Sequence, residues 1–271
     1  MTTLIAILLL LLIPGVMLIL HLTRLTSKFL WFAAFLGAVS AWVLIYVARS
    51  RMPYELAPQT WQPTFLFSLS PALKLDTFSW IFSMALVTLL MAVMLTSVAR
   101  LGWRGVPLRS SSTTLENHED PAQDIIPTAQ GVHWKAWAAN LALTSLGLVA
   151  VLAGNMLTLL LAWVALDIIE GLILLGQVAS SEERGQVVRA FSTRLSGVVT
   201  LMLAGIIAWS QGEQFNFDMS SDLATLFLFA AAGLRLGILP IFTPLFRELS
   251  MRVGLGTILR LIPVASSLML L

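Results

Sequence analysis

The chain has 271 residues, of which 58% are hydrophobic and 11% charged, with a formal net charge of +2 and a mean hydropathy of +0.90. A soluble globular domain carries about a quarter charged residues, so the composition excludes that class and favours a membrane protein. The absence of cysteine excludes disulfides, thiolate metal sites and cysteine-ligated iron–sulfur clusters. The slight basic excess does not indicate nucleic-acid binding, and we expect no cofactor.

The N-terminal region, residues 1–100, is predicted to form three transmembrane helices. Apolar blocks at 4–20, 29–47 and 78–98 are close to the length of about 20 residues that crosses a hydrocarbon core. Further apolar blocks follow the first one, which therefore does not read as a cleaved signal peptide. Residues 49–75 contain four prolines and are predicted to form a loop.

The second region, residues 101–135, is the longest polar stretch of the chain. Its segment 110–121 is rich in serine, threonine and acidic residues and has no apolar periodicity. Such a segment buries too little apolar surface to offset the entropy of ordering. We therefore expect a disordered loop on the cytoplasmic side.

The third region, residues 136–271, is predicted to hold five more transmembrane helices, at 138–152, 157–178, 187–209, 223–242 and 255–271. Pro240 lies inside the seventh helix and is expected to break it, because proline removes a backbone hydrogen bond and clashes with the preceding turn. The chain stops within or just after the eighth helix. We expect either that the sequence is the N-terminal part of a longer protein or that a partner chain continues the structure. The predicted fold class is all-α, a polytopic membrane bundle of about eight helices.

Basic residues distribute unevenly between the two sets of alternate loops. One set holds ten, and the other holds only three, namely Arg49, Arg51 and Lys74. Lysine and arginine concentrate in cytoplasmic loops. The sequence therefore predicts that the N-terminus lies on the outer side of the membrane. We expect this membrane to be a prokaryotic inner membrane.

Ionisable residues inside the predicted spans need a physical account, because each costs several kcal/mol in hydrocarbon. Asp167 and Glu170 lie one turn apart in the fifth helix, and Arg235 and Arg260 lie in the seventh and eighth. One reading is a polar axis that moves protons or cations. The other is a set of structural ion pairs, or charges near helix ends that reach the interface, as Glu170 and Arg194 would.

Several of these stretches resemble the antiporter-like membrane subunits of NADH:quinone oxidoreductase (respiratory complex I) and of multisubunit sodium/proton antiporters. The likeness is carried by the Asp76 region at 73–80, by the run from Gly154-Asn155 to Ala162-Trp163, by Arg235 to Pro240, and by Arg260. It covers what in the family is the N-terminal half, including the first of two inverted repeats. The outward N-terminus agrees with the family as well.

The departures from the family pattern lie at the residues that carry charge. Val164 stands where the family has a glutamate, and Asp167 lies one turn further on. Arg235 stands where the family has a lysine, whose proton affinity burial can lower. An arginine stays charged in almost any setting. We therefore expect Asp167 to be the ionisable relay, with Arg235 and Arg260 as electrostatic partners.

The resemblance implies a membrane-arm subunit that conducts protons or relays charge, with protons or sodium ions as the coupled ions and redox chemistry in other subunits. Its expected partners are the lipid bilayer and other membrane subunits of the assembly. A close variant is a degenerate subunit that no longer pumps. The alternative from another class is a membrane scaffold or assembly protein with structural ion pairs. A membrane enzyme has little support, because the three histidines lack metal-ligand spacing.

Overall fold

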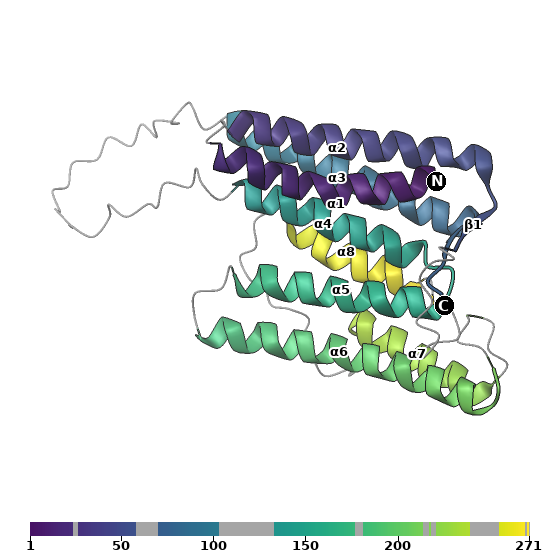
Figure 1. The fold of residues 1–271 in the computed structure, drawn as a ribbon. Coiled ribbons are helices and arrows are strands. Elements are labelled where there is room, and N and C mark those ends of the chain that lie inside the picture. Colours follow the sequence, from purple (N-terminus) through teal and green to yellow (C-terminus); the bar gives the residue numbers. More distant parts are fainter. Residues whose placement is uncertain are drawn as a thin grey trace, which may run out of the picture.

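The structure is a computed structural model that describes residues 1–23, 27–57, 70–102, 133–176, 181–213, 217, 221–238, 255–268 and 270. Within these ranges the predicted all-α membrane bundle is confirmed, with eight α-helices lying along a common direction (Figure 1). Their bounds are α1 (Thr2–Leu22), α2 (Ser27–Ala48), α3 (Thr77–Gly102), α4 (His133–Val151), α5 (Met156–Leu175), α6 (Ser181–Ser210), α7 (Asp222–Leu236) and α8 (Leu255–Leu268). Most of the predicted 101–135 loop lies outside the described residues.

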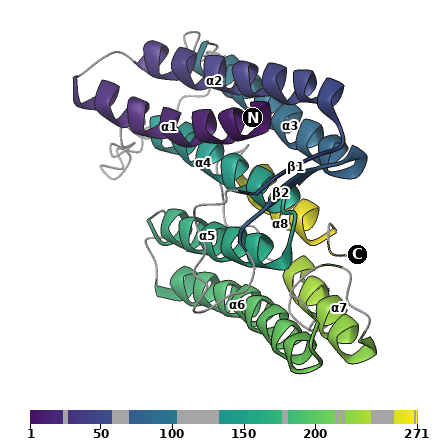
Figure 2. The ribbon, with the colours of Figure 1, turned by 45° about the vertical axis from the view of Figure 1, so that its right-hand side comes forward.

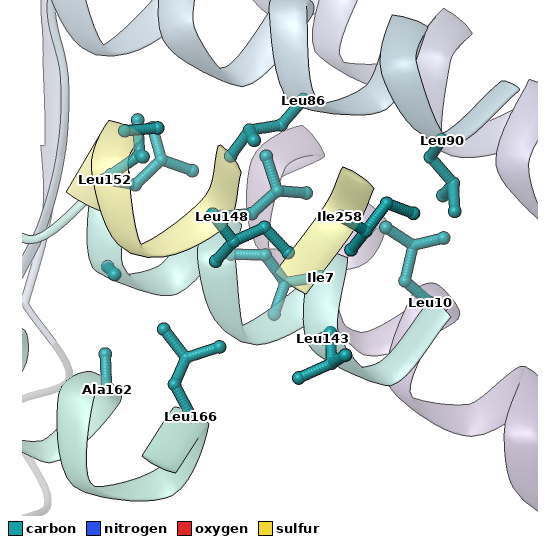
Figure 3. Packing of buried hydrophobic residues seen from close by; sticks show 14 of the residues in the cluster. Ile7, Leu10, Leu86, Leu90, Leu143, Leu148, Leu152, Ala162, Leu166 and Ile258 are labelled. Atoms are coloured by element: carbon teal, nitrogen blue, oxygen red, sulfur yellow. The ribbon is translucent and has the colours of Figure 1, made fainter. Parts of the chain in front are cut away.

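Helix α4 occupies the middle of the bundle. It packs against α1, α2 and α3 on one side and against α5 and α8 on the other, while α6 and α7 pack together at the far edge. The turned view in Figure 2 separates these groups, with α5, α6 and α7 forming a layer of their own. The buried apolar side chains between the groups, such as Leu10, Leu90, Leu148, Leu166 and Ile258, form one cluster (Figure 3).

Small residues on α4 let its neighbours approach closely. A Cβ atom added at Gly147 would lie 2.8 Å from a side-chain carbon of Ile262, which is closer than real Cβ atoms come. Helix packing inside a membrane depends on such close approach, because lipid supplies no hydrophobic drive between helices. Gly147 therefore sets the distance between α4 and α8.

The outer surface of the bundle is apolar. Five helical stretches in the described part of the chain are long and apolar enough to cross a membrane: Thr2–Leu22, Phe29–Arg51, Thr77–Ser97, Met156–Leu175 and Val187–Ser210. Large side chains such as Leu12, Leu172 and Trp209 are more than 60% exposed. A soluble monomer rarely exposes apolar patches of this extent, so the surface is suited to hydrocarbon.

Two short strands lie where the sequence predicted only a loop. β1 (Tyr54–Leu56) pairs antiparallel with β2 (Leu73–Leu75), which places Glu55 opposite Lys74. Main-chain hydrogen bonds tie this pair to the turn between α4 and α5, from Lys74 to Leu152 and from Gly154 to Ala72. The strands therefore cover the end of the bundle at which α5 begins (Figure 2).

Helix α7 ends earlier than the predicted 242. Its last helical residue is Leu236, and Gly237 follows in the left-handed conformation, with φ of +73°. The Ile238 amide donates to the Gly233 carbonyl, which closes the helix end as a glycine cap does. At 15 residues, α7 is about 22 Å long, too short to cross the hydrocarbon core alone. Pro240, the predicted break, lies outside the described residues.

Candidate functional site: paired charges between α5, α6 and α7

The first turn of α5 is anchored by Asn155. Its side-chain oxygen accepts hydrogen bonds from the Thr158 amide at 2.9 Å and from the Thr158 hydroxyl at 2.7 Å. Its amide group donates to the Ser70 carbonyl at 2.7 Å. Asn155 is thus both the N-cap of α5 and a tether to the segment before β2. This tether fixes where the charged face of α5 lies in the bundle.

A comparable cap starts α3. The Asp76 carboxylate accepts from the Ser79 amide at 2.8 Å, and the Ser79 hydroxyl accepts from the Asp76 amide at 2.9 Å. These reciprocal bonds satisfy backbone donors that the first turn of a helix leaves free. The Asp76 stretch, which carried part of the family resemblance, therefore has a structural role here.

Asp167 and Arg235 form a bidentate ion pair. The two terminal guanidinium nitrogens of Arg235 donate to the two carboxylate oxygens of Asp167, each at 2.8 Å. The exposed fractions of the two side chains are 0% for Arg235 and 2% for Asp167. Charge-assisted hydrogen bonds in this fork geometry are about twice as strong as those between neutral groups. The sequence expectation that these residues could pair within the membrane agrees with this geometry.

Trp163 completes the environment of Arg235. The guanidinium carbon lies 4.4 Å from the centre of the Trp163 ring, a cation–π arrangement. The same guanidinium reaches the Trp163 carbonyl at 3.5 Å. Trp163 precedes Asp167 by one helical turn, so one face of α5 holds Arg235 from two sides. This arrangement restrains the guanidinium in both position and orientation.

The ion pair lies near the middle of the bundle. Asp167 is about 16 Å along α5 from its first residue, Met156, at about 1.5 Å per residue. Arg235 is about 20 Å along α7 from Asp222 by the same measure. In a hydrocarbon core about 30 Å thick, groups at these distances along the helices would lie well away from the surface at which α5 and α7 begin.

Helix α6 supplies a second buried pair. Glu170 forms an ion pair with Arg194, and the exposed fractions of these side chains are 7% and 17%. From the sequence, Glu170 was a candidate for the charge relay, and both residues were also open to the alternative of charges near helix ends. The structure joins them to each other, one turn of α5 away from Asp167. The only sequence signal for Arg194 was its place inside the predicted span 187–209.

Glycine positions α6 for this arrangement. A Cβ atom at Gly197 would lie 3.2 Å from the Ala231 carbonyl oxygen and 3.7 Å from the Arg235 Cβ. The absence of a side chain therefore lets α6 approach α7 at the turn that carries Arg235. Because α6 also packs against α5, the charges of three helices come together.

The two carboxylates line one small cavity between α5 and α6, together with Arg194 and apolar side chains. The space open to the centre of a water molecule is about 10 Å³, close to the room that one water needs. The atoms that face this space are almost all carbon. The cavity therefore has room for about one water molecule beside the two carboxylates, but offers it few polar atoms.

The remaining predicted residues lie apart from these pairs. Arg260 is exposed on α8, and within the described part of the chain it makes no ion pair. Val164, which the sequence resemblance compared with a glutamate, is partly buried among apolar residues. In the described ranges no three His, Asp or Glu side chains gather in a way that would hold a metal ion.

No protein-family profile and no curated protein matches this sequence. The fold, however, is similar to that of solved structures. It superposes on a chain of respiratory complex I from Thermus thermophilus, with a TM-score of 0.64 and 10% identity, over 97% of this chain. It also superposes on a chain of the membrane-bound sulfane sulfur reductase, an archaeal respiratory membrane complex, with a TM-score of 0.52 and 15% identity, over 84% of this chain.

The chain shares its fold with chains of two respiratory complexes. It spans about half the length of the complex I chain, 52%, and 33% of the archaeal chain. At identities of 10% and 15% the likeness concerns the path of the backbone and carries no residue roles. The chemistry of the site therefore has to be argued from its own side chains.

Proposed function

We propose that this chain is a membrane-arm subunit, or the N-terminal part of one, in a complex-I-like or antiporter-like assembly. In this proposal the chain relays charge through its buried ion pairs, while other subunits perform the redox chemistry. The observation that supports it most directly is the row of two carboxylates and two guanidinium groups inside a bundle with this fold. Such groups are costly in a membrane unless paired, and they commonly mark ion or proton pathways.

The four groups divide by what each can do chemically. Arginine stays protonated in almost any setting, so Arg194 and Arg235 act as fixed positive charges. Only the carboxylates of Asp167 and Glu170 can take up and release a proton. Any proton movement through this cluster therefore begins or ends on a carboxylate.

We assign the proton-carrying role to Glu170 and the fixed electrostatic role to Asp167. Both Asp167 oxygens are occupied by Arg235, and breaking a buried pair costs about 3–5 kcal/mol. Glu170 has a partner, Arg194, whose side chain is 17% exposed, whereas Arg235, the partner of Asp167, is fully buried. This assignment departs from the sequence-based expectation, which placed the relay on Asp167.

The test uses the intact assembly reconstituted in vesicles. Proton translocation and electron transfer are measured for Glu170→Gln, with Glu55→Gln as the matched control, because Glu55 is an exposed glutamate in β1. We expect Glu170→Gln to lower the protons moved per electron while electron transfer continues. An unchanged ratio in Glu170→Gln would remove the relay proposal.

A second candidate function is a scaffold with structural ion pairs, which is also how a degenerate subunit would behave. One feature favours it: Asp167 binds Arg235 through two hydrogen bonds, and the resemblance compares Arg235 with a lysine. Under this reading, Asp167→Leu combined with Arg235→Met should leave assembly and proton translocation intact, because apolar replacement of a whole buried pair is often tolerated. Loss of translocation in an assembled complex would exclude the scaffold.

The assembly itself is tested by mild-detergent purification of the tagged native protein, followed by mass spectrometry. We expect other membrane subunits to be recovered in fixed proportion. The proposal includes a prokaryotic inner membrane, protons or sodium as the coupled ion and an outward N-terminus. A stable, monodisperse protein without partners would contradict it.

A further inference from the structure

The cavity beside Glu170 follows the seam between α5 and α6. On α5 it is lined by Asp167, Glu170, Gly171 and Leu174, which recur at helical spacing and therefore share one face. Leu174 is the next-to-last residue of α5, whereas Asp167 lies near the middle. The lining thus extends about 10 Å along the helix, from the buried charge to the helix end.

The α6 side of the cavity has the same spacing. Its lining residues are Val187, Ala190, Phe191 and Arg194. Helix α6 returns antiparallel to α5 (Figure 1). Val187, early in α6, therefore belongs with Leu174 near the end of α5, and Arg194 belongs with the charges because it pairs with Glu170. Apolar residues therefore line the end of the seam toward the membrane surface, and charged residues line its inner end.

Phe191 fills part of this seam beside Gly171. A Cβ atom added at Gly171 would lie 3.4 Å from a ring carbon of Phe191, so the ring rests on the surface that the glycine leaves open. At the outer end, the Leu174 and Val187 side chains are 6% and 2% exposed. These three apolar side chains separate the charged end of the cavity from the end of the helices.

We propose that the α5–α6 seam is the route by which water and protons reach Glu170, and that the Phe191 ring closes this route in the conformation described here. The inference rests on the proposed function for its use of protons, but the route can be tested without measuring proton flux. It predicts entry from the membrane side on which α5 ends and α6 begins. Opening requires that the ring turn away from Gly171 and that the Leu174 and Val187 side chains, which close the outer end, move apart.

The absence of cysteine makes the route directly measurable. Gly171→Cys places a thiol in the seam, and Leu172→Cys places one at the same depth on the bilayer-facing surface, where Leu172 is 67% exposed. The probe is a small, membrane-impermeant methanethiosulfonate cation applied to vesicles that carry the full chain with its partners. A thiol reacts with it only as the thiolate, which forms in water and not in hydrocarbon.

We expect the cysteine at 171 to be modified and the cysteine at 172 to remain unmodified. Adding Phe191→Ala should raise the rate at 171 by about tenfold or more, because a minor open state is populated to about 10% or less before the ring is removed. Equal rates at the two positions would overturn the route. A rate at 171 that Phe191→Ala leaves unchanged would overturn the closure by Phe191.

Two further pairs of variants complete the design. Arg184→Cys and Gln211→Cys, exposed near opposite ends of α6, report which membrane side the reagent reaches. Modification at 171 must come from the Arg184 side, and modification from the Gln211 side would contradict the route. If Gly171→Cys fails to accumulate, Ala190→Cys tests the same seam from α6, with the exposed Ser192→Cys as its control.

The outcomes separate the route from the proposed function. Selective modification with unchanged proton translocation in Glu170→Gln would keep the water route and remove the relay. No selective modification, with translocation lost in Glu170→Gln, would keep the relay and place its water supply elsewhere.

Discussion

Arg235 and Asp167 are 68 residues apart in the chain, yet two hydrogen bonds of 2.8 Å join them side by side in the middle of the bundle. The ring of Trp163 lies 4.4 Å from the same guanidinium. This arrangement connects α5 to α7 through charge as well as through packing. Replacing one member of the pair should therefore lower the free energy of unfolding by more than replacing both, because a single replacement leaves a buried charge unpaired.

The first prediction concerns this pair. Asp167→Leu alone should lower the free energy of unfolding by about 3–5 kcal/mol, because it leaves the Arg235 charge buried without a partner. Asp167→Leu with Arg235→Met should recover most of that loss. Thermal unfolding in detergent, followed by circular dichroism, measures both. A double variant no more stable than the single one would show that the loss does not come from an unpaired Arg235 charge.

The second prediction separates two arginines that the sequence placed in one group. Arg260→Gln should change the free energy of unfolding by no more than about 0.5 kcal/mol, because Arg260 is exposed on α8. Arg235→Gln makes the same chemical change at a buried pair and should cost about 3–5 kcal/mol. The two variants are compared in one detergent by the same thermal measurement. Equal losses would mean that Arg260 has a buried partner.

The third prediction tests the close approach of α6 and α7. Gly197→Val should cost about 1–3 kcal/mol, because its side chain meets the Ala231 carbonyl, a backbone atom that has little freedom to move. Gly185 lies on the same helix with open space around it. Gly185→Ala should therefore be neutral or should stabilise α6 by up to about 1 kcal/mol. Similar effects at both glycines would argue against tight packing at Gly197.

The fourth prediction concerns the anchor of α5. Asn155→Ala should cost about 1–2 kcal/mol, since it removes the helix cap and the tether to the Ser70 carbonyl. Asn155→Asp keeps the accepting oxygen but loses the donor, so its cost should lie between those of wild type and alanine. Hydrogen exchange at the amides of the first turn of α5 distinguishes a lost cap from a general loss of stability. Unchanged exchange in Asn155→Ala would refute the capping role.

Much of the architecture was predictable from the sequence, because hydrocarbon imposes a simple rule. Backbone polar groups must be satisfied within each spanning segment, so long apolar blocks become helices whatever their neighbours are. The five described stretches that are long and apolar enough to span a membrane follow from this rule. The pairing of Asp167 with an arginine follows from the cost of an isolated charge. Helix ends were less predictable. Gly237 ends α7 several residues before the predicted boundary, because a left-handed cap competes with continuation of the helix.

The sequence by itself determined the all-α membrane class, the approximate spans and the presence of charges that need partners. Only the tertiary structure decided which charge meets which: Arg194 joins Glu170, while Arg260 remains outside. It also decided that the segment before α3 forms strands that hold the α4–α5 turn. The physical reason is that periodicity and hydropathy describe one helix at a time. Ion pairs and close approaches depend on the rotation and spacing of helices that are distant in the sequence.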